Sequence, residues 1–187
     1  MLRSQYEIRW HGRGGQGVVT AAQIVTAASI LKGYFAMTFP EFGPERRGAP
    51  VTAYTRIGLR KIYHREPILS PDYVVILDPA LLYDPTVFDG VKGDTIIIAN
   101  YPREPVMLNF IAGKVGRILY VDATGIALKA LGKPIVNTAI IGALLKAFNL
   151  ITVDDVKRTF EEFFHGSLLK MNIDALVRAY EETKVWG

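Results

Sequence analysis

Residues 7–32 read EIRWHGRGGQGVVTAAQIVTAASILK and carry the strongest structural pattern in the chain. Polar and apolar residues alternate over residues 7–11, which is typical of a short strand. A glycine-rich loop follows at 12–17, and the next residues stay uncharged as far as Lys32, as in a largely buried helix. Gly33 suits the position just after a helix end. This stretch therefore predicts a strand, a glycine loop and a helix.

The rest of the chain continues an α/β pattern. Continuous apolar runs, typical of parallel strands covered on both faces, occupy residues 73–77, 95–99 and 117–121. Further strands are expected at 34–39 and 51–57, with residues 61–63 as a hairpin partner across Gly58. Helices are expected at 123–131, 139–148, 153–164 and 173–184, with Thr152 and Asn172 as N-caps of the last two. The predicted fold is a three-layer α/β domain with a mainly parallel sheet and additional C-terminal helices, formed by residues 1–187 as one domain.

The composition excludes several classes of protein. Half of the 187 residues are hydrophobic and 21% are charged, which argues against intrinsic disorder. The sequence has no cysteine, so disulfides, thiolate nucleophiles and cysteine-held zinc or iron–sulfur clusters are excluded on this chain. The first residues lack the apolar core of a signal peptide, and no uncharged run is apolar enough to span a membrane. We therefore expect a cytoplasmic protein without a membrane partner.

Positive charge is concentrated in the first third of the chain. Residues 1–65 hold 10 Lys and Arg against 3 Asp and Glu, whereas residues 66–187 hold 12 against 15. This asymmetry favours an anionic ligand or an acidic partner near that end, although scattered solvated charges would give the same count. Most aromatic residues fall inside expected strands and helices, so nucleic acid is not an expected partner.

The glycine loop has the spacing of a phosphate-binding loop. Gly12, Gly14 and Gly17 satisfy G-x-G-x-x-G, and such a loop can turn backbone N–H groups and a helix dipole toward a phosphate. A dinucleotide fold also needs an acid at the end of the second strand, but the nearest, Glu41, lies beyond Pro40. No Walker lysine follows the loop. The loop is interpreted either as an anion site or as a purely structural tight turn.

Arg46 and Arg47 lie in a second loop, at residues 40–50, that is rich in glycine and proline. Both loops are expected at the carboxyl edge of the sheet, where ligands of open α/β sheets bind. Together with Arg13, these arginines could converge on a phosphate-rich ligand. Alternatively, they pair with Glu41, with Glu45 or with a neighbouring protein.

Other polar residues do not assemble a reactive centre. The three histidines have no spacing typical of a metal site or a nucleophilic dyad, and each is interpreted as structural: His11, His64 and His165. Asp78 precedes Pro79 at the end of an expected strand and is interpreted as a turn former, although it lies at the expected ligand edge. Because no acid–base pair can be assembled, no catalytic residue is expected.

Two motifs, HGRGGQG at residues 11–17 and FGPERRGAPV at residues 42–51, strongly resemble the gamma subunit of 2-oxoacid:ferredoxin oxidoreductases. The pyruvate and 2-oxoisovalerate enzymes are the nearest likeness. Agreement continues in the strand that ends with Leu77 and Asp78, and again at residues 137–142. The resemblance therefore covers nearly the whole chain.

The resemblance implies a noncatalytic subunit of a complex that oxidatively decarboxylates pyruvate or a related 2-oxoacid to an acyl-CoA and reduces ferredoxin. In that family thiamine diphosphate and the iron–sulfur clusters reside on companion alpha, beta and delta chains, so this chain is expected to hold no cofactor alone. The resemblance also implies a role in assembly and in coenzyme A recognition. The residues it implies for this role are Gly12, Arg13, Gly14, Gly15, Gln16, Gly17, Arg46 and Arg47. The same residues could instead form the contact with the alpha chain. A freestanding nicotinamide-dependent dehydrogenase and a purely structural scaffold remain the alternatives.

Overall fold

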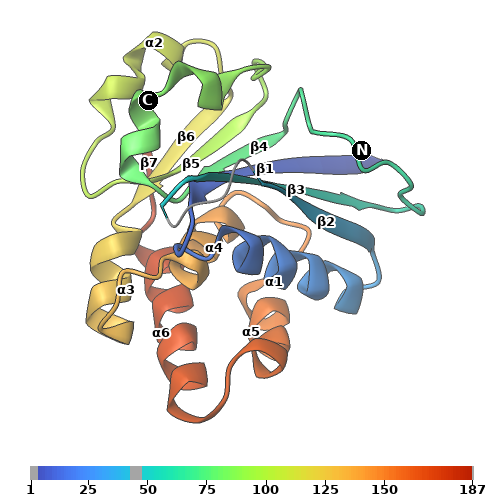
Figure 1. The fold of residues 1–187 in the computed structure, drawn as a ribbon, viewed down its shortest axis with the longest axis vertical. Coiled ribbons are helices and arrows are strands. Elements are labelled where there is room, and N and C mark those ends of the chain that lie inside the picture. The colour runs from blue at the N-terminus through green and yellow to red at the C-terminus, as the bar shows by residue number, and fades with distance from the viewer. Residues whose placement is uncertain (1–3, 43–47, 187) are drawn as a thin grey trace.

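The computed structural model describes residues 4–42 and 48–186. Its centre is a seven-stranded sheet in the order β2-β3-β1-β4-β5-β6-β7 (Figure 1). The strands are β1 (Gln5–Arg13), β2 (Phe35–Phe42), β3 (Pro50–Gly58), β4 (Tyr73–Ile76), β5 (Ile96–Asn100), β6 (Arg117–Val121) and β7 (Lys184–Trp186). Strands β1, β4, β5 and β6 run parallel, whereas β3 is antiparallel to β1 and β2, and β7 is antiparallel to β6. The predicted α/β class with a mainly parallel sheet is confirmed.

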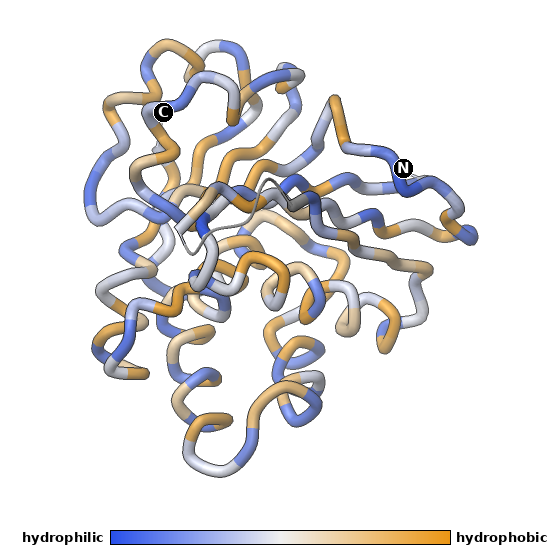
Figure 2. The backbone as a smooth tube through the Cα atoms, in the orientation of Figure 1, coloured by the Kyte–Doolittle hydropathy of each residue, from blue (hydrophilic) through white to orange (hydrophobic). Residues whose placement is uncertain are grey.

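Helical layers cover the two faces of this sheet (Figure 1). The long helices share one face and are α1 (Val18–Leu31), α3 (Ala123–Leu131), α4 (Asn137–Leu145), α5 (Val153–Phe163) and α6 (Gly166–Glu182). Short helices cover the other face of β4, β5 and β6, namely η1 (Pro79–Tyr83), η2 (Pro85–Phe88), η3 (Val106–Leu108) and α2 (Asn109–Ala112). Each face has its own hydrophobic core. Figure 2 shows hydrophobic segments running through the sheet and the helices next to it.

Side-chain alternation in β1 separates an apolar face from a polar one. Ile8 and Trp10 are fully buried in the core shared with α1, and the Trp10 indole donates to Thr55 Oγ1 at 2.9 Å. The intervening Arg9 and His11 therefore point to the opposite face. In β4 both faces are apolar, because helices cover both of them.

The structure corrects three expectations about local structure. Residues 61–63 form no strand, because β3 already pairs with β1 and β2 on its two sides. Asn172 does not cap a helix but lies buried inside α6, where its Oδ1 accepts from Thr138 Oγ1 at 2.9 Å. Strand β2 continues past Pro40, which is tolerated on the edge strand of the sheet. The Thr152 cap is confirmed, with a capping box to Asp155.

Candidate functional site

The glycine loop lies at the point where the order of the sheet reverses. From β1 the chain passes through α1 to the β2–β3 pair on one side, and only later to β4 on the other. In open α/β sheets the carboxyl ends of the strands form a ligand crevice at such a point. Because β2 is antiparallel to β3 and β3 to β1, the end of β2 and the start of β3 lie at this edge too. The two loops selected from the sequence therefore meet here.

The chain of the glycine loop is folded tightly on itself. Strand β1 extends to Arg13, so Gly12 and Arg13 belong to the strand rather than to the loop. The Gln16 side-chain oxygen accepts from the Arg13 backbone N–H at 2.7 Å, while the Gln16 N–H donates to the Arg13 carbonyl at 3.1 Å. A Cβ on Gly12 would lie 2.5 Å from Val18 Cγ2, so a glycine is needed there for α1 to pack against the strand.

Asp78 links this loop to the neighbouring strand. It follows β4 and accepts from the Gln16 side-chain amide at 2.8 Å, and its Oδ2 lies 3.2 Å from Arg13 Nε. Its other oxygen caps η1 by accepting from the Ala80 N–H at 2.8 Å. The prediction of a turn former is correct but incomplete, since the same carboxylate also pairs with Arg13 at the end of β1.

The N-terminus of α1 faces the site without a charged or polar cap. Gly17 is the N-cap residue with φ 81°, and within the described residues no side chain caps the helix. The first turn also lacks an acidic residue. Asn137, at the start of α4, packs closely against Gly17. A Cβ added to Gly17 would lie only 2.8 Å from Asn137 Nδ2. Free amides at a helix start together with its dipole favour an anion at this position.

The second loop contacts the first through its described end. The Arg13 guanidinium donates to the Gly48 carbonyl at 3.2 Å, and the Gly14 N–H donates to the Ala49 carbonyl at 3.0 Å. These bonds place the chain just before β3 beside the glycine loop, as expected. Arg46 and Arg47, the other predicted site residues, lie outside the described residues.

A polar cavity of about 310 Å³ opens on the other side of β1, lined in part by Arg9, His11, Thr52 and Asp84. The buried Arg9 donates to three backbone carbonyls, those of Ile68, Val87 and Asp89, at 2.7–3.2 Å. It also donates from Nε to His11 Nε2 at 3.0 Å, which leaves the proton of the neutral imidazole on Nδ1.

The state of His11 follows from its surroundings. Burial and the adjacent Arg9 charge lower the pKa of His11 to about 3, so the ring is neutral at physiological pH. The interpretation of His11 as a structural residue therefore has a physical basis, namely as a neutral acceptor for a buried guanidinium.

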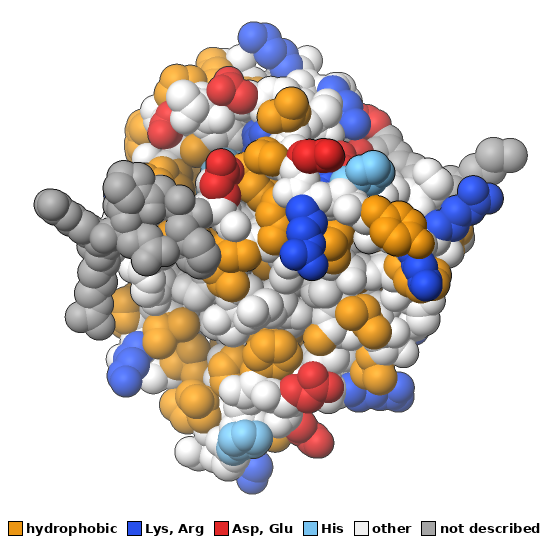
Figure 3. All heavy atoms as spheres, turned by 45° about the vertical axis from the view of Figure 1, so that its right-hand side comes forward, with side chains coloured by type: hydrophobic (Ala, Val, Ile, Leu, Met, Phe, Trp, Pro, Cys, Tyr) orange, Lys and Arg blue, Asp and Glu red, His pale blue; other side chains and the backbone are white. Residues whose placement is uncertain are grey.

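The remaining predicted features are dispersed. His64 is exposed, and His165 directly precedes α6. No group of three or more His, Asp or Glu residues in the described part of the chain is placed to hold a metal ion. None of the helices within residues 4–42 and 48–186 has the length and apolar character needed to cross a bilayer. On the face shown in Figure 3, Lys and Arg side chains are spread among hydrophobic ones rather than gathered in one patch.

Sequence reasoning missed three features of this edge. It did not identify Asn137 as a neighbour of the glycine loop, the Arg9–His11 pair, or a pocket that contains Tyr83 and Tyr101. The Arg9–His11 pair had a detectable signal, since polar residues two apart in a strand share one face. The other two depend on which strands are neighbours.

Comparison with known proteins gives a consistent match. The family model described as pyruvate ferredoxin/flavodoxin oxidoreductase matches residues 7–182. A pyruvate/ketoisovalerate oxidoreductases common subunit gamma from Thermococcus kodakarensis is 46% identical over 181 residues, which cover 96% of this chain and 98% of the relative. A pyruvate synthase subunit PorC from Methanocaldococcus jannaschii is 44% identical, with 94% of this chain and 96% of the relative covered.

Comparison with solved structures gives a match in sequence and fold and another in fold alone. The pyruvate oxidoreductase subunit PORC from Thermotoga maritima has a TM-score of 0.85 and 35% identity, with 99% of this chain and 100% of that chain covered. A 2-oxoglutarate:ferredoxin oxidoreductase from Magnetococcus marinus, solved with 2-oxoglutarate, coenzyme A and succinyl-CoA bound, has a TM-score of 0.79. At 21% identity, and with 31% of that chain covered, this second likeness concerns the fold.

Proposed function

The chain belongs to the pyruvate ferredoxin/flavodoxin oxidoreductase family, and from this premise we propose that it is the gamma subunit of a multisubunit 2-oxoacid:ferredoxin oxidoreductase. The complex oxidatively decarboxylates pyruvate or a related 2-oxoacid to an acyl-CoA and reduces ferredoxin. This chain supports assembly and coenzyme A recognition without a catalytic residue of its own. It acts in the cytoplasm, bound to alpha, beta and delta chains.

The likeness to gamma and PorC subunits supports this assignment. Relatives with these names align with this chain over nearly their whole length. The absence of cysteine supports a division of labour in which companion chains hold the iron–sulfur clusters. Thiamine diphosphate would reside on the companion chains as well.

The proposal that this chain recognises coenzyme A rests on the N-terminus of α1, which lies where the sheet order reverses and has no side-chain cap among the described residues. Backbone N–H groups of the first turn of α1 would receive the phosphates, as at other helix N-termini, since the Gly14 and Gln16 N–H groups already donate to backbone carbonyls. Gly15 has φ 98°, and a Cβ there would meet open space, so a ligand can approach the backbone closely. Because Asp78 neutralises Arg13, additional positive charge would come from Arg46 and Arg47.

The geometry weighs against a nicotinamide-dependent dehydrogenase. Strand β3 lies between β1 and β2, so the end of β2 is one strand further from the glycine loop than in a dinucleotide-binding fold. The acid near that end, Glu41, accepts a hydrogen bond from the Tyr54 hydroxyl. Its carboxylate is thus already engaged on the polar face of the sheet.

The test is an Arg46→Ala/Arg47→Ala variant in the assembled complex. Loss of charge-assisted bonds to phosphate should raise the KM for coenzyme A about tenfold or more, with little change in kcat. The matched control is Arg60→Ala/Arg65→Ala, which removes the same charge from exposed positions. If the arginine variant changed neither the KM for coenzyme A nor the subunit composition, the chain would be a purely structural scaffold. Loss of the companion chains would instead indicate a subunit contact.

A further inference from the structure

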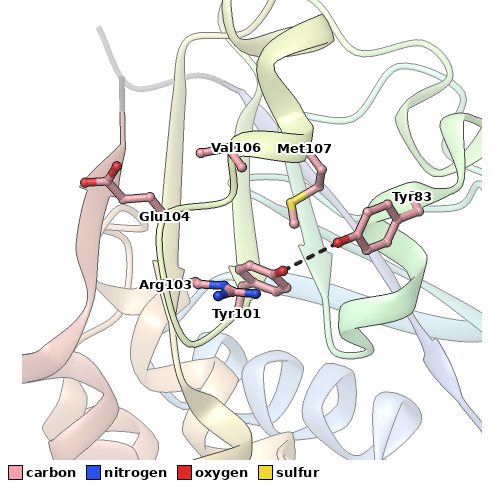
Figure 4. Close-up of a pocket in the computed structure, with 6 residues that line it drawn as sticks. All are labelled: Tyr83, Tyr101, Arg103, Glu104, Val106 and Met107. Atoms are coloured by element: carbon pink, nitrogen blue, oxygen red, sulfur yellow. Dashed lines mark hydrogen bonds between the residues drawn. The ribbon is translucent and has the colours of Figure 1, made fainter.

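The carboxyl edge of the sheet has a second feature beside the glycine loop. An open pocket of about 690 Å³ is lined by Tyr83, Tyr101, Arg103, Glu104, Val106 and Met107, and we call it the tyrosine pocket (Figure 4). Tyr83 is the last residue of η1, Tyr101 directly follows β5, and Val106 and Met107 belong to η3. The pocket is therefore built by three segments that follow or flank parallel strands.

The side chains of the tyrosine pocket have a definite arrangement. The hydroxyl groups of Tyr83 and Tyr101 lie 3.5 Å apart, and Met107 points toward this pair (Figure 4). Arg103 lies against Tyr101, and the hydrogen bond with Tyr83, followed by that from Arg103, lowers the pKa of the Tyr101 hydroxyl. Glu104 points away from the tyrosines. Two aromatic rings, a thioether and a guanidinium thus face one space.

Part of this apolar surface is exposed, while Tyr101 and Met107 are half-buried. Tyr83 is 65% exposed and Val106 is 58% exposed. The backbone beneath them is anchored, since the Tyr101 N–H donates to the Val121 carbonyl at 2.9 Å and η1 is capped by Asp78. Fixed aromatic and apolar surface next to a guanidinium suits a flat heteroaromatic ring, which stacks on aromatic faces and accepts hydrogen bonds at its edge.

The spacing to the glycine loop suits a nucleotide. The loop follows β1 and Tyr101 follows β5, with β4 alone between these strands. Two strand spacings correspond to about 10 Å, comparable with the separation of the base and the 5′-phosphates in an extended nucleotide. Asp78 connects the two features directly, because it bonds Gln16 of the loop and caps the helix that carries Tyr83.

We propose that the tyrosine pocket binds the adenine ring of coenzyme A, with Tyr101 as the main stacking surface and Arg103 at the edge of the base. This inference rests on the proposed function, since the phosphates would lie at the glycine loop. It assigns base recognition to residues that the two sequence motifs do not contain.

The test uses the assembled oxidoreductase and two fragments of coenzyme A as competitive inhibitors. Adenosine 3′,5′-bisphosphate carries the adenine end, and 4′-phosphopantetheine lacks it. A Tyr101→Ala variant should raise the KM for coenzyme A and the inhibition constant of the bisphosphate about tenfold, because one stacking contact is lost. The inhibition constant of 4′-phosphopantetheine should stay unchanged. Tyr101→Phe retains the ring and should stay close to the wild-type values.

Controls separate this inference from the proposed function. The control variant is Tyr63→Ala. Tyr63 is 78% exposed and lies in the segment between β3 and β4, at the opposite edge of the sheet. Its removal should change neither the KM for coenzyme A nor the two inhibition constants. An unchanged inhibition constant for the bisphosphate in Tyr101→Ala would overturn the adenine site, while a raised KM in Arg46→Ala/Arg47→Ala would leave the proposed function standing. If neither variant altered the KM for coenzyme A, both would be wrong. Copurification of the companion chains with Tyr101→Phe and Tyr101→Ala verifies that the variants are folded.

Discussion

Arg13 and Asp78 form an ion pair across the switch point of the sheet, with 3.2 Å between Arg13 Nε and Asp78 Oδ2. Arg13 ends β1, and Asp78 follows the adjacent parallel strand β4. The pair thus ties together the two strand ends that border the candidate site. Because Arg13 is paired, the positive feature at this edge is the start of α1, which no side chain within the described residues caps.

Asp78→Ala should destabilise the protein by about 2 kcal/mol, because it removes the η1 cap and leaves the Gln16 side-chain amide without its acceptor. Asp78→Asn keeps a cap acceptor and should cost less. Urea denaturation of the purified chain gives both free energies of unfolding. Equal costs for the two variants would contradict the role assigned to the cap.

Gly17→Ala should cost more than Gly15→Ala. Both glycines have positive φ, so each variant strains the backbone by about 1 kcal/mol. At Gly17, however, the added methyl would also lie 2.8 Å from Asn137, whereas Gly15 has open space. A clash of this kind adds about 1–3 kcal/mol. Thermal unfolding of the two variants measures the difference in stability. A lower melting temperature for Gly15→Ala than for Gly17→Ala would contradict the prediction.

Gly142→Ala should separate α4 from α6. A Cβ at this position would lie 2.2 Å from the Leu176 carbonyl oxygen, and backbone atoms cannot yield as a flexible side chain can. We expect a loss of about 3 kcal/mol or more. Gly113→Ala, in open space at the end of α2, is the control and should change stability little. Denaturant midpoints of the two variants test this, and equal midpoints would contradict the close approach of the helices.

His11 should make stability depend on pH. Because the pKa is about 3 in the folded protein and about 6.5 in an unfolded chain, the unfolded state binds more protons between these values. The stabilisation is complete above pH 6.5 and is lost as pH falls toward 3, by up to about 1.4 kcal/mol per pH unit.

A His11→Gln variant retains an acceptor for Arg9 but cannot titrate. Its free energy of unfolding should fall less steeply between pH 6.5 and 4.5 than that of the wild type. Parallel slopes for the two proteins would show that His11 is not the group responsible.

The elements of the fold follow from local patterns. The strand, glycine loop and helix at the N-terminus, the apolar strands β4–β6 and the Thr152 cap were all predictable, because each depends on residues close in sequence. The two loops could be placed at one edge for the same reason. The false hairpin at residues 61–63 and the false cap at Asn172 arose where local preference competes with distant packing.

Tertiary structure alone decided which of these residues meet. The insertion of β3 between β1 and β2, the pairing of Asp78 with Arg13, and the contact of Asn137 with Gly17 join residues that are far apart in the chain. The tyrosine pocket likewise exists only because β4 and β5 are neighbours. Periodicity records which face of an element is buried but not which element covers it, since that depends on the joint packing of all layers.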